Sequence, residues 1–152
     1  MTDLVLREVS LAEDCPTIRH RVFLLQDEAQ EESAILIVAF EGRYRDCSEG
    51  NPDAAFMRGQ IDLARGVWWY HSGLVIDLSK LSYRGGDQIL LPLQNSEHMP
   101  SAIVVGPDCE GALATLMCDD DPQSVTDFDD IFDNLEAAIA YVQRPRPGGP
   151  PG

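Results

Sequence analysis

His20, His71 and His98 are the candidate catalytic bases of this chain, which contains no other histidine. A serine or cysteine nucleophile needs such a base within hydrogen-bond reach. His71 directly precedes an expected strand and His98 lies in an expected loop, at opposite ends of the central part of the chain. The sequence also lacks the G-x-S-x-G turn that presents the nucleophilic serine of many hydrolases. The sequence therefore predicts no catalytic residues, and we expect a protein that is not an enzyme.

The cysteines show no catalytic or metal-binding spacing. Cys15, Cys47, Cys109 and Cys118 are scattered along the chain without a C-x-x-C pair. The first residues, MTDLVLREVS, lack the basic and long apolar regions of a secretory signal. Cysteines in a chain of this size without a leader are typically reduced thiols. We therefore expect a cytoplasmic protein without disulfides.

Aspartates that could ligate a metal are dense near the end of the chain. They are Asp119, Asp120, Asp121, Asp127, Asp129, Asp130 and Asp133. A calcium-binding EF-hand loop needs ligands at alternate positions, a central glycine and a terminal glutamate. This run contains Pro122 and has no such glycine. The run favours a solvated loop and helix-start carboxylates over a metal site, with weak cation binding as the alternative.

A glycine corner, Arg84-Gly85-Gly86-Asp87, follows the buried strand expected over Leu74 to Leu78. Backbone N–H groups and a guanidinium at such a corner can hold an anion. The charge of Asp87, in the N-cap position, would compete with a bound phosphate. Neither G-x-x-x-x-G-K-[ST] nor G-x-G-x-x-G is present. A corner capped by Asp87 is the preferred interpretation, and binding of an anion or small ligand at Arg84–Asp87 is the alternative. No cofactor is expected.

Apolar patterns indicate the elements that position this corner. We expect a leading strand over residues 4–9 and a helix after the corner, and further strands and helices as follows. The other strands are Thr17–Gln26, Ser33–Phe40, Leu74–Leu78 and Ser101–Val105, and the other helices are Pro52–Arg65, Cys109–Met117 and one capped by Asp133 and Glu136. Trp68 and Trp69 are expected to be buried against the first long helix.

The order of these elements predicts the fold class. From Ile35 onward they follow a β-α-β-α-β-α order that ends in a further helix. This order predicts an α/β fold with parallel central strands, and the first strands make the sheet mixed. A length of 152 residues favours one domain, expected over residues 1–143. The tail over residues 144–152, RPRPGGPPG, is expected to be disordered.

The chain is strongly acidic, with 26 acidic and 11 basic residues and a formal net charge of −15. This charge repels nucleic acid and anionic membranes, so we expect neither as a partner. No stretch of about 18 apolar residues indicates a transmembrane helix. The charge favours either a basic protein partner or a plain solvated surface.

The stretch Val75-Ile76-Asp77-Leu78-Ser79-Lys80-Leu81-Ser82-Tyr83 resembles the signature strand and turn of STAS domains, found in anti-sigma factor antagonists and sulfate transporters. In that family an apolar strand ends in a D-L-S-like step and leads to an Asp-Ser-Ser-Gly corner that opens a helix. Residues 131–138, IFDNLEAA, are similar to the last strand end and capped final helix of the family. The resemblance covers residues 33–142. It implies a non-enzymatic, regulatory or adaptor domain of the bacterial partner-switching type.

The chain departs from the STAS pattern at the corner. The Asp-Ser-Ser-Gly of the family falls on Gly85-Gly86-Asp87-Gln88, so Gly86 or Asp87 replaces the serine that accepts phosphate. The resemblance then implies a site without phosphorylation, in which Asp87 supplies a fixed negative charge. The expected partner-binding residues are Ser82, Tyr83, Arg84, Gly85, Gly86, Asp87 and Gln88.

Two further functions stay open. The stretch from Tyr83 to Asp87 is similar to the oxyanion-hole turn of the crotonase superfamily, which binds acyl thioesters. Those enzymes are much longer and carry a second glycine-rich helix start, which is missing after Val105. The other alternative is a structural subunit of an assembly, whose acidic surface contacts a basic neighbour.

Overall fold

The computed structural model describes residues 4–27, 30–46, 50–93, 99–117 and 130–143. The strands are β1 (Ile18–Asp27), β2 (Gln30–Arg43), β3 (Gly73–Ser82), β4 (Ser101–Val105) and β5 (Ile131–Phe132). The helices are α1 (Leu11–Asp14), α2 (Gly50–Val67), α3 (Leu90–Leu93), α4 (Glu110–Met117) and α5 (Leu135–Gln143), and a 3₁₀ turn, η2 (Asp87–Ile89), precedes α3. Among the described helices, none has the length and apolar character needed to cross a membrane. The predicted tail over residues 144–152 lies outside the described residues.

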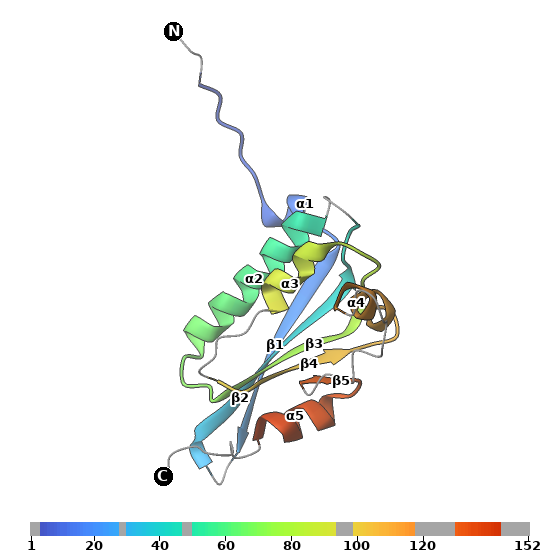
Figure 1. Ribbon diagram of the computed structural model, residues 1–152. Coiled ribbons are helices and arrows are strands. Elements are labelled where there is room, and N and C mark those ends of the chain that lie inside the picture. The colour runs from blue at the N-terminus through green and yellow to red at the C-terminus, as the bar shows by residue number, and fades with distance from the viewer. Residues whose placement is uncertain (1–3, 28–29, 47–49, 94–98, 118–129, 144–152) are drawn as a thin grey trace.

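The strands form one sheet in the order β1-β2-β3-β4-β5 (Figure 1). Strand β1 is antiparallel to β2, and the pairs β2–β3, β3–β4 and β4–β5 are parallel. The predicted α/β class, with a mixed sheet and parallel central strands, is therefore confirmed. The short strand β5 lies between α4 and α5, where the order read from apolar patterns has no strand and the resemblance to STAS domains places a strand end. Two residues are too few to give a periodic pattern.

One face of the sheet is covered by α2, α3 and α4 (Figure 1). Alternate residues of β2 and β3 point to this face because successive side chains of a strand face opposite sides. The stripe predicted for α2 is buried against them, at Ala54, Met57, Ile61 and Ala64. Each large apolar side chain buried here stabilises the fold by about 1.5–3 kcal/mol as an upper estimate. This side of the sheet holds the larger core.

Among the described elements, α5 is the helix that covers the opposite face, over β3, β4 and β5. The smaller core contains Ile35, Ile37, Val75, Ala102, Val104, Ala138 and Val142. Helix α5 contacts β3, β4 and β5. Above β1, Phe23 is 50% exposed and Leu25 is 39% exposed. The part of this face over β1, Ala39 of β2 and residues 77–80 of β3 is less covered, and we name it the open face.

Helix α5 begins one residue later than the sequence predicts. The side-chain oxygen of Asn134 accepts a hydrogen bond from the backbone N–H of Ala137 at 2.8 Å, so Asn134 is the N-cap. Asp133 instead accepts a hydrogen bond from the Asn134 amide at 2.9 Å. The predicted capping box with Asp133 as N-cap is wrong, because the neighbouring asparagine is an equally good cap.

Two other predictions about apolar segments are also wrong. Residues 4–9 form no strand, and the segment leads away from the domain with Leu4 92% exposed and Leu6 100% exposed (Figure 1). Apolar residues in an extended segment form a strand only where a partner strand is available. Both tryptophans follow the end of α2 at Val67; Trp68 packs against the larger core as predicted, but Trp69 is 77% exposed.

Candidate functional site

Strand β3 carries a bulge at the start of the candidate site. Ala39 pairs with Asp77, but Glu41 pairs with Lys80, so two residues of β3 lie opposite Phe40. The carboxylate of Asp77 accepts a hydrogen bond from the backbone N–H of Ser79 at 2.9 Å. A bulge changes the alternation of a strand and redirects the following side chains. Asp77 and Lys80 consequently both line the open face.

Gly106, at the end of β4, makes room for this bulge. A Cβ atom at Gly106 would lie 2.1 Å from the carbonyl oxygen of Ser79, far inside van der Waals contact. The obstructing atom belongs to the backbone, which cannot rotate away as a side chain can. The bulge in β3 therefore requires glycine at position 106.

The predicted corner, Ser82–Gln88, is held from inside by Tyr83. The Tyr83 side chain is 2% exposed, and its ring packs edge-to-face on Tyr44 with centroids 5.2 Å apart. Its hydroxyl donates a hydrogen bond to the carbonyl oxygen of Gly86 at 2.5 Å. Its backbone N–H donates to the carbonyl of Asp108 at 3.0 Å. Tyr83 thus ties both sides of the corner to the larger core.

The outer surface of the corner carries Arg84 and Gln88, which are exposed, and Gly85 and Gly86, which are half-buried. Gly86 has φ +111°, a conformation that favours glycine. Ser82 is half-buried, and its carbonyl accepts a hydrogen bond from the Tyr44 N–H at 2.8 Å. The side chain of Asp87 lies outside the described residues, so its capping role stays a prediction.

The helix predicted after the corner is present over the described residues 87–93, as two short turns. The three residues of η2 lead into the four residues of α3, which contains Pro92. Proline lacks the N–H that would continue the hydrogen-bonded turn. Because these turns are so short, the helix dipole at the corner is smaller than that of a long helix.

A buried ion pair, Arg45–Asp53, lies next in sequence to Tyr44, whose ring packs on Tyr83 of the corner. Asp53, in the first turn of α2, is 0% exposed and lies 2.9 Å from Nη2 of Arg45. It also accepts hydrogen bonds from Nε of Arg45 at 3.1 Å and from the Arg45 backbone N–H at 2.9 Å. Nη2 of Arg45 further donates to the carbonyl of Asp14 at 2.6 Å. The pair joins α1, the end of β2 and α2, next to the Tyr44 ring that packs on Tyr83.

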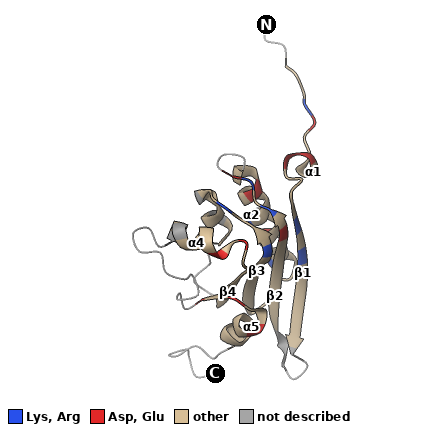
Figure 2. Cartoon of the chain, turned by 90° about the vertical axis from the view of Figure 1, so that its right-hand side faces the viewer, with Lys and Arg blue, Asp and Glu red and all other residues tan. Residues whose placement is uncertain are grey.

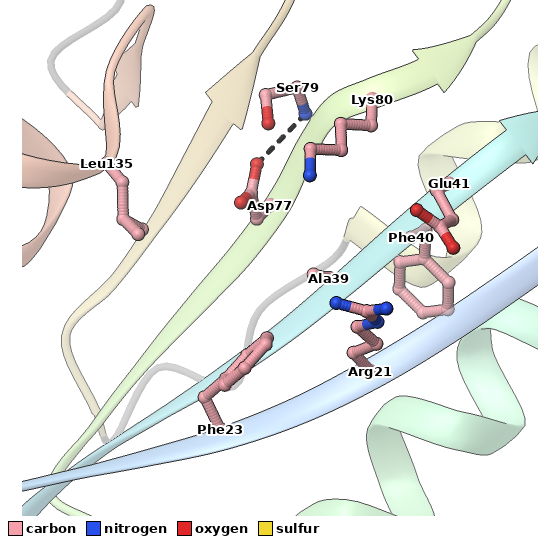
Figure 3. A pocket seen from close by; sticks show the side chains of 9 residues that line it. All are labelled: Arg21, Phe23, Ala39, Phe40, Glu41, Asp77, Ser79, Lys80 and Leu135. Atoms are coloured by element: carbon pink, nitrogen blue, oxygen red, sulfur yellow. Dashed lines mark hydrogen bonds between the residues drawn. The ribbon is translucent and has the colours of Figure 1, made fainter.

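A pocket of about 200 Å³ opens on the open face, beside the first residue of α5. It is lined by Arg21, Phe23, Ala39, Phe40, Glu41, Asp77, Ser79, Lys80 and Leu135 (Figure 3). Arg19 and Arg21 lie near the start of β1, and Figure 2 shows basic residues on this strand. This pocket was not predicted, because it is formed by residues that only the strand register brings together.

The two described histidines, His20 and His71, are far apart. His20 pairs with Phe40, whereas His71 lies two residues before Gly73, which pairs with Ile35. The rise of about 3.3 Å per residue places their backbones roughly 16 Å or more apart. The His20 ring packs on Phe56 with centroids 5.7 Å apart, and the Nδ1 atom of His71 lies 2.7 Å from the carbonyl of Trp68. His98 lies outside the described residues.

The described thiols are poorly suited to act as nucleophiles. Cys15 and Cys109 are free and buried, with Sγ atoms 3.3 Å from the Pro52 carbonyl and 3.6 Å from the Leu78 carbonyl. Burial raises the pKa of both thiols above the usual value of 9.0. Cys47 and Cys118 lie outside the described residues.

The predicted aspartate run falls mostly on residues 118–129, which also lie outside the described residues. In the part of the chain that the structure describes, no three His, Cys, Asp or Glu side chains come together as a metal site would require.

No protein-family model matches this chain, and no curated protein sequence matches it. The resemblance to STAS domains therefore depends on the residues from Val75 to Tyr83 and on the pattern of elements around them.

Proposed function

We propose that this chain is a non-enzymatic, STAS-like protein-interaction domain of the regulatory or adaptor kind. It binds a protein partner through the corner Ser82–Gln88. The observation that carries the proposal is the construction of this corner. Tyr83 anchors the segment in the core, while Arg84 and Gln88 remain exposed on the other side. A rigid, exposed segment loses little conformational entropy on binding.

The arrangement of β3 supports the STAS-like assignment. The D-L-S step, Asp77-Leu78-Ser79, lies in the bulge and leads through the end of β3 to the corner. The corner also lies at the carboxyl end of a parallel strand, where α/β proteins commonly bind their ligands. These features match the pattern from which the resemblance was drawn.

Docking is better supported than anion binding at the same corner. The helical turns after the corner have three and four residues, so few aligned N–H groups are available. Arg84 is exposed, where a single charge pair contributes little. A protein partner can use the side chains and the backbone of the whole corner together.

The corner presents no serine at Gly86 or Asp87, so the proposed interaction is not switched by phosphorylation there. The net charge of −15 favours a partner with a basic contact surface. We therefore expect the complex to weaken as ionic strength rises.

Capture of partners on the full chain, followed by crosslinking and measurement of the dissociation constant, tests this proposal. Asp87→Lys, which opposes a basic partner, and Gly86→Trp should each weaken binding by at least about tenfold, which corresponds to about 1.4 kcal/mol. Asp62→Lys on α2 is the matched control for the charge change, and it should leave the dissociation constant unchanged. The proposal is wrong if partners bind Gly86→Trp and Asp87→Lys as tightly as the natural chain, or if no partner is captured.

A further inference from the structure

We propose that the pocket on the open face binds a small zwitterion, namely an α-amino acid with an apolar side chain. This site is separate from the corner and does not depend on the function proposed for the corner. Its volume of about 200 Å³ is below the roughly 300–1,000 Å³ of pockets that hold drug-sized ligands. The occupant must therefore be small.

The floor of the pocket is Ala39, between two oppositely charged residues. The strand register places Arg21, Ala39 and Asp77 in one row across β1, β2 and β3. Adjacent strands are about 4.8 Å apart, so the backbones of Arg21 and Asp77 are about 10 Å apart across the methyl group of Ala39. Figure 3 shows Arg21 on one side of Ala39, and Asp77 and Lys80 on the other. A small residue between a cation and a carboxylate leaves space for a ligand that carries both charges.

The polar groups of the pocket are not fully used within the protein. Among the described residues, Arg21 and Lys80 form no ion pair, although both line the pocket. The carboxylate of Glu41 lies 3.7 Å from the guanidinium of Arg19. Asp77 uses one oxygen to accept the Ser79 N–H, which leaves the other oxygen for a donor. A ligand carboxylate can therefore contact Arg21 and Lys80, and a ligand ammonium can donate to Asp77.

Apolar side chains lie at one end of the same pocket. Phe23 on β1 is 50% exposed, and Leu135, the first residue of α5, is 36% exposed. Figure 3 shows both on the side of the pocket away from Glu41. An apolar side chain of the ligand would cover them and remove apolar surface from water.

The balance of charge favours a zwitterion over a simple anion or cation. Two cations, Arg21 and Lys80, and two carboxylates, Glu41 and Asp77, line the pocket and cancel. A simple anion would be repelled by the whole chain, whose net charge is −15. A simple cation would leave Arg21 and Lys80 without a partner. A zwitterion satisfies both signs at once.

Titration of the ¹⁵N-labelled full chain with four probes tests the proposal. The probes are L-leucine, glycine, 4-methylpentanoate and isopentylamine, which separate the zwitterion from its apolar side chain and from each charge. L-leucine should shift the amide signals of Ala39, Asp77 and Lys80 saturably, with a dissociation constant below about 1 mM. Glycine and the two singly charged probes should bind at least about tenfold more weakly. The proposal is wrong if L-leucine causes no saturable shift, or if 4-methylpentanoate or isopentylamine binds equally well.

Two substitutions locate the site. Ala39→Leu fills the floor of the pocket, and Arg21→Gln removes the cation beside it at an exposed position. Each should weaken L-leucine binding by at least about tenfold. Arg58→Gln on α2, the control for loss of an arginine, should bind L-leucine as the natural chain does. Binding that survives both pocket substitutions would show that L-leucine binds elsewhere and would overturn the assignment.

Discussion

Replacing Asp53 with asparagine changes one atom of a buried carboxylate and should greatly lower the free energy of unfolding. Its carboxylate is 0% exposed and accepts three hydrogen bonds from Arg45, at 2.9, 2.9 and 3.1 Å. Asp53→Asn keeps the shape but removes the charge and directs an amide toward the guanidinium. Removing one member of a buried ion pair leaves the other charge uncompensated and costs about 3–5 kcal/mol. We expect the free energy of unfolding to fall by this amount.

Urea unfolding followed by circular dichroism measures the effect. A slope of about 2 kcal/mol per molar urea converts the expected loss into a midpoint lower by about 1.5–2.5 M. For a chain of this size, the melting temperature should fall by about 6–20 °C. The slope itself should not change, because the substitution does not alter the surface exposed on unfolding.

The surface pair Arg58–Asp62 is the control, because it has a similar distance but different burial. Its Nε and Oδ2 atoms are 3.1 Å apart, and its side chains are 36% and 53% exposed. Asp62→Asn should cost no more than about 0.5 kcal/mol, since exposed pairs of this spacing are weak. If Asp53→Asn costs as little as Asp62→Asn, burial does not determine the strength of the Arg45–Asp53 pair, and the reasoning fails.

Two further predictions concern the bulge and the buried thiols. Gly106→Ala places a methyl group against the Ser79 carbonyl and should destabilise the fold by about 1–3 kcal/mol in urea unfolding. At Gly59, in the middle of α2, an added Cβ has no heavy atom within 4 Å, so Gly59→Ala should stabilise the fold by about 0.5–1 kcal/mol. If the two substitutions change the free energy of unfolding equally, the explanation for Gly106 is wrong. Burial raises the pKa of Cys15 and Cys109, so the folded state favours the neutral thiols. The stability that this preference contributes is fully present below pH 9.0, the ordinary pKa of the thiol, and is lost as the pH rises through the raised values of the folded state. The stability of the natural chain should therefore fall more steeply above pH 9.0 than that of Cys15→Ala/Cys109→Ala, and parallel curves would refute the assignment.

The elements with long apolar patterns were predictable from the sequence. The run Ser33–Phe40 and the stripe from Ala54 to Ala64 became β2 and α2, because burial of a whole face depends on many residues together. The leading strand failed because pairing needs a partner elsewhere in the chain. The cap of α5 failed because Asp133 and Asn134 are both good caps, and only the local geometry chooses between them.

The bulge left a signal in the sequence that periodicity alone does not reveal. Core-facing residues of β3 recur every second position up to Leu78, and the next is Leu81, three positions later. A step of three in an alternating strand indicates one extra residue. The pocket has no comparable signal. Arg21, Ala39 and Asp77 come together only through the register of three strands, and the sequence contains no direct record of that register.

The bulge links the two proposed sites, since both depend on the same irregularity in β3. It places Asp77 and Lys80 on the open face and also sets which face Leu81 and Tyr83 occupy. Without the extra residue, Tyr83 would point to the opposite face and could not anchor the corner in the larger core. Ala39→Leu should therefore affect only the pocket and Asp87→Lys only the corner, whereas Gly106→Ala, which strains the bulge, should weaken both. Any other result for Gly106→Ala in a folded protein would mean that the corner and the pocket keep their geometry independently of β3.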